Sequence, residues 1–143
     1  MPIKIGILGF AHGHVNMYCN QWRDNSALDV SVVAGWDHDA ARLEQNTKTY
    51  GFTPYADAKA LLAQSGVDAV VVSAETSLHA ELVEQAAAAG KAVILQKPMA
   101  LTMTEADRIV AAVNRHGIPF SMAWQMRVDP QNVQIKELMG SGQ

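Results

Sequence analysis

The segment GFAHGHV at residues 9–15 follows a short apolar run and has the composition of a phosphate-binding loop. Gly9 matches the first glycine of a G-x-G-x-x-G dinucleotide fingerprint, whereas Ala11 and His14 occupy the other two glycine positions. In such a turn, backbone N–H groups and the positive end of the following helix dipole hold a pyrophosphate. Because two glycines are replaced, the segment alone fits an ordinary strand-to-helix turn as well.

Asp37 follows the next apolar run, about 20 residues after this loop, where dinucleotide-binding folds place an acidic side chain. Its carboxylate is predicted to accept hydrogen bonds from the adenosine ribose and to repel a 2′-phosphate, which favours NAD over NADP. A protonated His38 would weaken that preference. Trp36 either flanks the adenine or packs at the strand end.

His12 and His14 form an H-x-H pair, which has two possible interpretations. One is a metal site, but catalytic metal sites usually have three protein ligands, and no third lies at a supporting spacing. We therefore expect no metal. The alternative is that the pair caps the helix or contacts the pyrophosphate.

Lys97 follows the apolar run 92–95, so a parallel sheet would place it at the edge where open α/β folds bind ligands. Its ammonium would hold a reacting hydroxyl by a hydrogen bond and lower the pKa of a neighbouring acid or base. The position of Lys97 alone fits a solvated surface lysine equally well.

Short apolar runs and helical patterns alternate along the chain and would position these residues. The predicted strands are 3–8, 30–35, 68–73, 92–95 and 119–124. The clearest predicted helices are 78–89, ending at Gly90, and 106–113, ending at Gly117. Strands that are apolar along their whole length are typical of a parallel sheet covered on both faces. The pattern predicts a doubly wound α/β fold of the Rossmann type.

No repeat or linker interrupts residues 1–127, which we predict to form one dinucleotide-binding domain. Residues 128–143 carry a last helical pattern with Ile135, Leu138 and Met139 on one face. We expect them to begin the connection to a missing C-terminal substrate domain.

Composition argues against several kinds of partner. The net charge of −3 is dispersed, without the basic stripe that nucleic-acid binding requires. The single cysteine, Cys19, cannot form an internal disulfide. The N-terminal apolar run is too short for a signal peptide. We expect a cytoplasmic protein with no nucleic-acid or membrane partner.

Five motifs span nearly the whole chain in order: KIGILGFAHGHV, VVAGWDHDAAR, YGFTPYADAKALL, VDAVVVSAETSLHAELVEQAAAAGKAVILQKPMALTMTEA and HGIPFSMAWQMRVDP. The sequence resembles the glucose-fructose oxidoreductase and inositol dehydrogenase family, Gfo/Idh/MocA. The resemblance implies that Lys97 lies by the nicotinamide and the substrate hydroxyl, before a cis bond to Pro98. It implies a structural or cofactor-side role for His79. The predicted cofactor-binding set is completed by Phe10, Ser73, Ala74 and Gln96.

Three departures from the family pattern are visible. Gln96 replaces the usual glutamate, and Ala74 with Glu75 replaces a Thr-Pro pair. The glycine loop is irregular, so we expect weak cofactor binding by this chain alone.

The predicted function is hydride transfer between NAD and a hydroxyl-bearing substrate, a sugar or polyol, by a full-length dehydrogenase that forms a homo-oligomer. The catalytic histidine of the family belongs to the missing domain, so we expect the chain alone to be inactive. The alternatives are a non-catalytic nucleotide-binding or regulatory module, and NAD-dependent cleavage of glycosidic bonds.

Overall fold

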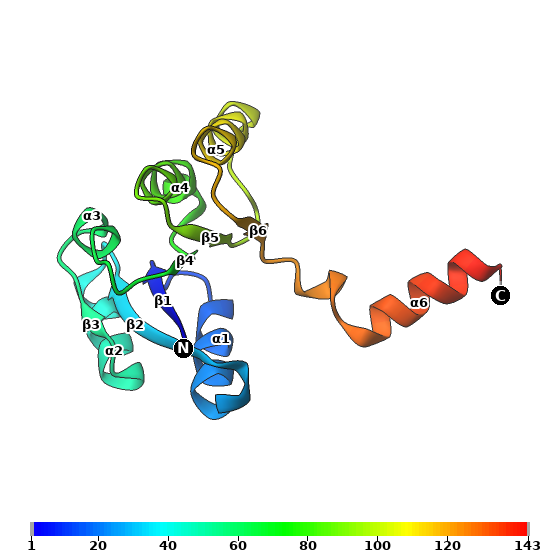
Figure 1. Cartoon of the computed structure of the whole chain (residues 1–143), viewed down its shortest axis with the longest axis horizontal. Helices are drawn as coiled ribbons and strands as arrows, with labels where there is room; N and C mark the ends of the chain where they lie inside the picture. The colour runs from blue at the N-terminus through cyan, green and yellow to red at the C-terminus, as the bar shows by residue number, and fades with distance from the viewer. Residues whose placement is uncertain (1, 143) are drawn as a thin grey trace.

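The computed structural model describes residues 2–142, in which one parallel sheet forms the centre of the molecule (Figure 1). Its strand order is β3-β2-β1-β4-β5-β6. The strands are β1 (Ile3–Leu8), β2 (Val30–Trp36), β3 (Thr53–Pro54), β4 (Ala69–Val72), β5 (Ala92–Leu95) and β6 (Phe120–Met122). All five neighbouring pairs are parallel, which confirms the predicted doubly wound sheet.

Strand β3 was not predicted from the sequence. It has two residues, both exposed, and pairs only with β2 at the edge of the sheet. Proline lacks an N–H to donate, and Pro54 is tolerated at this position because an edge strand has a side without a partner. A segment this short and polar gives no strand periodicity.

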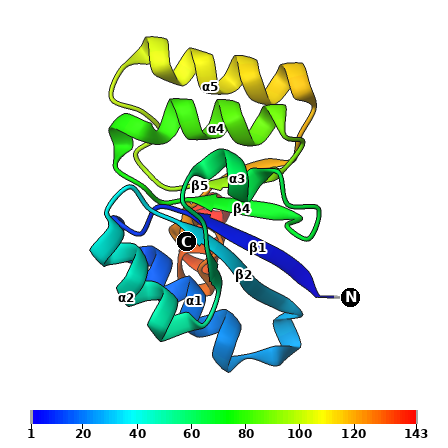
Figure 2. The same ribbon diagram turned by 90° about the vertical axis from the view of Figure 1, so that its left-hand side faces the viewer.

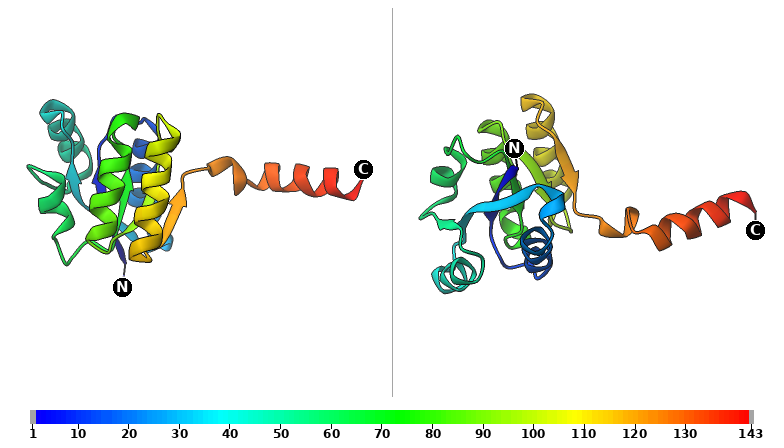
Figure 3. Two further views of the ribbon diagram at one scale, coloured as in Figure 1. Left: turned by 90° about the horizontal axis from the view of Figure 1, so that it is seen from above. Right: turned by 60° about the horizontal axis from the view of Figure 1, so that its bottom comes forward.

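Helices cover both faces of the sheet, as Figure 2 shows. The helices of the described chain are α1 (His14–Asp24), α2 (Ala40–Tyr50), α3 (Ala58–Leu62), α4 (His79–Ala88), α5 (Met103–His116) and α6 (Pro130–Ser141), of which α6 does not cover the sheet. Helices α1 and α2 lie on one face, and α4 and α5 lie side by side on the other (Figures 2 and 3). Single turns of 3₁₀ helix precede β2, α4 and α6.

Strand β4 shows why both faces of the sheet must be covered by helices. Val70 and Val72 pack into the hydrophobic cluster formed with α3, α4 and α5. Val71, which points the other way, packs into the cluster with α1 and Phe52. All three valines are fully buried. Side chains of a strand alternate between faces, so an uninterrupted apolar strand requires cover on both.

The helix ends are mostly specified by local side chains. The Oδ1 of Asp39 accepts hydrogen bonds from the N–H groups of Ala41 and Arg42 at the start of α2. Thr102 and Glu105 form a reciprocal capping box at the start of α5. Helix α1 is preceded by Gly13 and, like α4, has no side-chain cap. The N–H groups of Val15 and Asn16 at its start donate to the His12 and Gly13 carbonyls.

Helix α6 extends away from the sheet (Figures 1 and 3). Asp129 caps it and Pro130 opens its first turn. Its apolar side chains Ile135, Leu138 and Met139 are 53%, 45% and 76% exposed. The predicted helix is confirmed, while the division into domains at residue 127 stays a prediction.

Within residues 2–142, the helices all lack the length and apolar content needed to cross a bilayer.

Candidate functional site

The candidate site lies at the carboxyl edge of the sheet. Because the strands are parallel, the segments that follow β1, β2, β4 and β5 all emerge there. The loop Gly9–His14 follows β1, and Lys97 follows β5, so both lie at this edge as predicted. The His12 N–H donates to the Ser73 carbonyl at 3.1 Å, which ties the β1 loop to the end of β4.

Gly9 is required by both conformation and space. Its φ is +88°, a region that L side chains rarely adopt. A Cβ at this position would lie 2.3 Å from the Cα of Ala74, which is itself fully buried. Gly13, in contrast, has no atom near the place of a Cβ. The first glycine of the loop therefore serves close packing of β1 against the β4 loop.

Phe10 contributes its backbone to the site. Its ring stacks on Phe52, with centroids 5.3 Å apart and planes 8° from parallel, inside the core. Its N–H donates to the Oδ2 of Asp37 at 2.7 Å. The side chain of Phe10 thus packs in the core, away from the predicted cofactor.

Asp37 is the most heavily bonded carboxylate at this edge, and its side chain is fully buried. Oδ2 accepts from the Phe10 N–H at 2.7 Å and from Arg42 Nε at 2.7 Å. Oδ1 accepts from the Asp39 N–H and from Arg42 Nη2, both at 2.8 Å. Burial raises the pKa of Asp37, but these hydrogen bonds outweigh it and hold the pKa below its usual value.

These contacts change what Asp37 can offer a ligand. A carboxylate has about four lone-pair sites, and four donors already occupy them. A ribose hydroxyl would therefore have to displace one of the donors. The carboxylate charge is also paired with the Arg42 guanidinium, so Asp37 by itself presents no unbalanced charge to a 2′-phosphate.

Arg42 and Glu75 join this cluster although sequence reasoning did not place them there. Arg42 Nη2 donates to Glu75 Oε1 at 2.9 Å, across the end of β1. His38 Nδ1 lies 3.3 Å from Glu75 Oε2 and 3.5 Å from Asp37 Oδ1. Two features of the sequence could have indicated these contacts: Arg42 lies in the first turn of α2, just after Asp37, and Glu75 stands where the family has a proline.

The two loop histidines contact each other. Their Nδ1 atoms are 3.4 Å apart, and their rings stack at 5.6 Å. Burial lowers the pKa of His12, the charges of Lys97, His14 and His79 lower it further, and a hydrogen bond with the Lys97 backbone opposes them. His12 is therefore a neutral neighbour of Lys97 at pH 7. The predicted capping role is wrong, because no side chain caps α1.

Across residues 2–142, the structure brings together no group of three metal-binding side chains.

Gln96 and Lys97 lie directly after β5. Gln96 is fully buried and donates through Nε2 to the Tyr18 hydroxyl at 2.9 Å, and Gln125 donates to the same oxygen at 2.6 Å. Burial raises the pKa of Tyr18, which keeps the phenol protonated. The Lys97–Pro98 bond is cis, as the family resemblance implied. Within residues 2–142, the ammonium of this half-buried lysine has no hydrogen-bond or ion-pair partner.

His79 ties two loops together from a fully buried position. Its Nε2 lies 3.1 Å from the Ala74 carbonyl. Its Nδ1 lies 3.0 and 3.2 Å from the carbonyls of Pro98 and Met99. These contacts are those of a structural residue that fixes the segment after Lys97.

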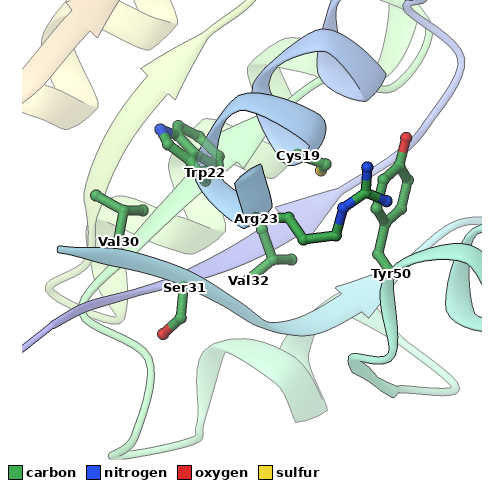
Figure 4. A pocket seen from close by; sticks show the side chains of 7 residues that line it. All are labelled: Cys19, Trp22, Arg23, Val30, Ser31, Val32 and Tyr50. Atoms are coloured by element: carbon green, nitrogen blue, oxygen red, sulfur yellow. The ribbon is translucent and has the colours of Figure 1, made fainter. Parts of the chain in front are cut away.

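Two pockets lie at different ends of the sheet. A pocket of about 320 Å³ contains Trp36 together with Leu78, Leu82 and other side chains of α3 and α4. A pocket of about 290 Å³, shown in Figure 4, lies between α1, the first residues of β2 and the end of α2. The second pocket opens toward the amino end of β2, so it is separate from the candidate site.

We expect Cys19, which lines the pocket of Figure 4, to be unreactive in the folded chain. Its side chain is buried, and burial raises the pKa of the thiol to about 12, so very little thiolate exists at pH 8. Titration with a chromogenic disulfide should show no reaction in the native protein and one reacting thiol per chain in denaturant. Rapid modification of the native protein would contradict this burial.

We expect Asp37→Asn to flatten the acid limb of the stability profile. The folded pKa of Asp37 lies below its unfolded value of about 3.9, so its bonds stabilise the fold above that pH. That stability is lost as the pH falls through the folded pKa. Urea unfolding between about pH 6 and pH 2 should show a smaller decrease for the variant than for the native chain. Asp107→Asn, at an exposed carboxylate of α5, should keep the native slope.

Comparison with known proteins identifies the family. Residues 3–123 match the Gfo/Idh/MocA family model, described as "Oxidoreductase family, NAD-binding Rossmann fold". D-apiose dehydrogenase of Paraburkholderia graminis is 36% identical over 127 residues, covering 88% of this chain and 32% of that protein. Inositol 2-dehydrogenase/D-chiro-inositol 3-dehydrogenase of Shouchella clausii is 31% identical over 144 residues, covering 97% and 40%.

A solved 3-ketoreductase from Actinomadura kijaniata, in complex with NADP and TDP-benzene, superposes with a TM-score of 0.86 at 27% identity. The match covers 99% of this chain and 43% of that one. The chain belongs to the Gfo/Idh/MocA oxidoreductase family and is its NAD(P)-binding Rossmann domain. It spans 32% to 40% of the length of the two curated relatives.

Proposed function

We propose that the chain is the NAD(H)-binding part of a dehydrogenase that oxidises a hydroxyl group on a sugar or polyol. One observation carries the proposal: the Gly9–His14 loop and Lys97, whose ammonium has no hydrogen-bond or ion-pair partner among residues 2–142, lie at one edge of the sheet. Relatives named as apiose and inositol dehydrogenases support the substrate class.

The residues present fit a dinucleotide. Helix α1 begins at this edge, so the positive end of its dipole would favour an anion there, and Gly9 lets the loop pack closely on Ala74. The nicotinamide, when bound, supplies the hydride acceptor. Lys97 would hold the substrate hydroxyl by a charge-assisted hydrogen bond, and His79 and Gln96 would fix the segment on either side of it.

The proton acceptor is assigned to a second domain, together with the substrate pocket and subunit contacts. The exposed apolar side chains of α6 and the greater length of the relatives support this division at about residue 127. A nucleotide-sensing module is the second candidate, favoured by the replacement of two loop glycines with Ala11 and His14.

Fluorescence titration of the chain with NADH tests the binding step. We expect saturable binding at one site per chain, weak because of the irregular loop. Ala11→Asp should weaken it at least tenfold, since a carboxylate at this exposed loop position would repel the pyrophosphate. Ala111→Asp, at an exposed position of α5, should not. Absence of saturable NADH binding by the native chain would refute the proposal.

The catalytic step is tested separately on the complete protein. Reduction of NAD in the presence of aldoses or cyclic polyols is the expected result. NADH binding without turnover on any such compound would favour the sensing module.

A further inference from the structure

Asp37 alone does not account for a preference for NAD, because Arg42 balances its charge and its acceptor sites are filled. We infer that Glu75 is the residue that discriminates against NADP. This inference rests on the proposed binding of NAD(H) at this edge and goes further by naming the residue that selects the cofactor.

The position of Glu75 follows from the topology. Strands β2 and β4 lie on either side of β1, so the loops after them flank the glycine loop. Glu75 lies in the loop after β4, and Asp37 lies at the end of β2. In dinucleotide-binding folds the ribose 2′ position lies against the acidic residue at the end of the second strand. The Asp37–Arg42–Glu75 cluster therefore surrounds the place where a 2′-phosphate would extend.

The charge of the cluster decides which cofactor fits. Arg42 carries one positive charge and is bonded to two carboxylates, those of Asp37 and Glu75. Asp37, Arg42 and Glu75 together carry a net charge of −1. The Glu75 side chain is 40% exposed and that of Arg42 is 25% exposed, although Glu75 Oε2 itself is buried beside His38. A 2′-phosphate would meet a guanidinium already held by two carboxylates, whereas a 2′-hydroxyl adds no charge.

Removing the Glu75 charge should reverse this effect. In Glu75→Gln, Asp37 still holds Arg42 through two hydrogen bonds, so the guanidinium stays at the sheet edge. The cluster becomes neutral, so a phosphate no longer meets a net negative charge, although the glutamine amide oxygen can still accept the Arg42 Nη2 hydrogen. Asp37, His38 and the glycine loop are unchanged, so NADH binding should be nearly unaffected.

The experiment measures the dissociation constants of NADH and NADPH for the 143-residue chain by fluorescence titration. The native chain should prefer NADH, and Glu75→Gln should tighten NADPH binding about tenfold while NADH binding changes less than about twofold. Glu75→Asp, which keeps the charge on a shorter side chain, should retain the preference. Glu84→Gln removes another arginine-paired carboxylate, between α4 and α5, and should change neither constant.

Salt dependence separates a charge effect from a structural one. Between about 0.01 M and 1 M ionic strength the Debye length falls from about 30 to about 3 Å, so the preference of the native chain should narrow. For Glu75→Gln, the ratio of the NADPH and NADH dissociation constants should change much less over the same range of salt.

Several results would overturn the inference. An unchanged NADPH-to-NADH ratio in Glu75→Gln, or equal weakening of both cofactors, would remove Glu75 from this role. So would a gain in NADPH binding by Glu75→Asp equal to that of Glu75→Gln. If the native chain binds neither cofactor, the proposed function fails, and this inference with it.

Discussion

Replacing Lys97 by alanine in the complete enzyme is expected to lower kcat about a hundredfold or more while leaving the affinity for NADH nearly unchanged. Lys97 lies after β5, where the family resemblance implies the nicotinamide end of the edge, whereas Gly9 and Asp37 follow β1 and β2. Most dinucleotide contacts would come from that second region. The Lys97 ammonium, which has no partner within the described part of the chain and lies next to a neutral His12, would be available to hold a substrate hydroxyl.

Steady-state kinetics measure kcat, and a separate titration measures the affinity for NADH. Lys59→Ala, at an exposed lysine of α3, is the matched control and should leave kcat unchanged. A near-normal kcat for Lys97→Ala, or a defect confined to NADH affinity, would mean that Lys97 is a surface or structural lysine. The catalytic role implied by the family would then be wrong for this chain.

Gly9→Ala is expected to destabilise the fold by about 3 kcal/mol or more, because two costs act together. The backbone has a φ of +88°, and the new Cβ would lie 2.3 Å from the Cα of Ala74. The obstacle is backbone, which cannot rotate away as a long side chain can. Either β1 or the β4 loop must shift, and the proposed NADH-binding edge shifts with it.

Urea unfolding followed by circular dichroism measures this effect. Gly13→Ala is the control, since a Cβ there meets nothing within 4 Å and its φ is −56°. Its expected change is below about 1 kcal/mol, the usual range for a helix N-cap substitution. Similar stabilities for the two variants would show that the close contact between Gly9 and Ala74 does not constrain the fold.

The sequence by itself determined the fold class and the edge on which the site lies. Uninterrupted apolar runs such as 92–95 can be buried only in a sheet covered on both faces, and crossover helices make that sheet parallel. A parallel sheet places every strand-to-helix loop at one edge, so Gly9 and Lys97 had to lie there together. These consequences depend on local periodicity and topology, both of which a single sequence contains.

Tertiary structure decided how the side chains at that edge are used. Asp37 was predicted from its spacing to bind ribose. Its carboxylate oxygens instead accept hydrogen bonds from the N–H groups of Phe10 and Asp39 and from the Arg42 guanidinium. Glu75 reaches Arg42 over 33 positions of sequence, because β2 and β4 flank β1 in the sheet. Hydrogen bonds between residues so far apart leave no spacing pattern in a single chain. They arise only when the strand order brings the two loops together.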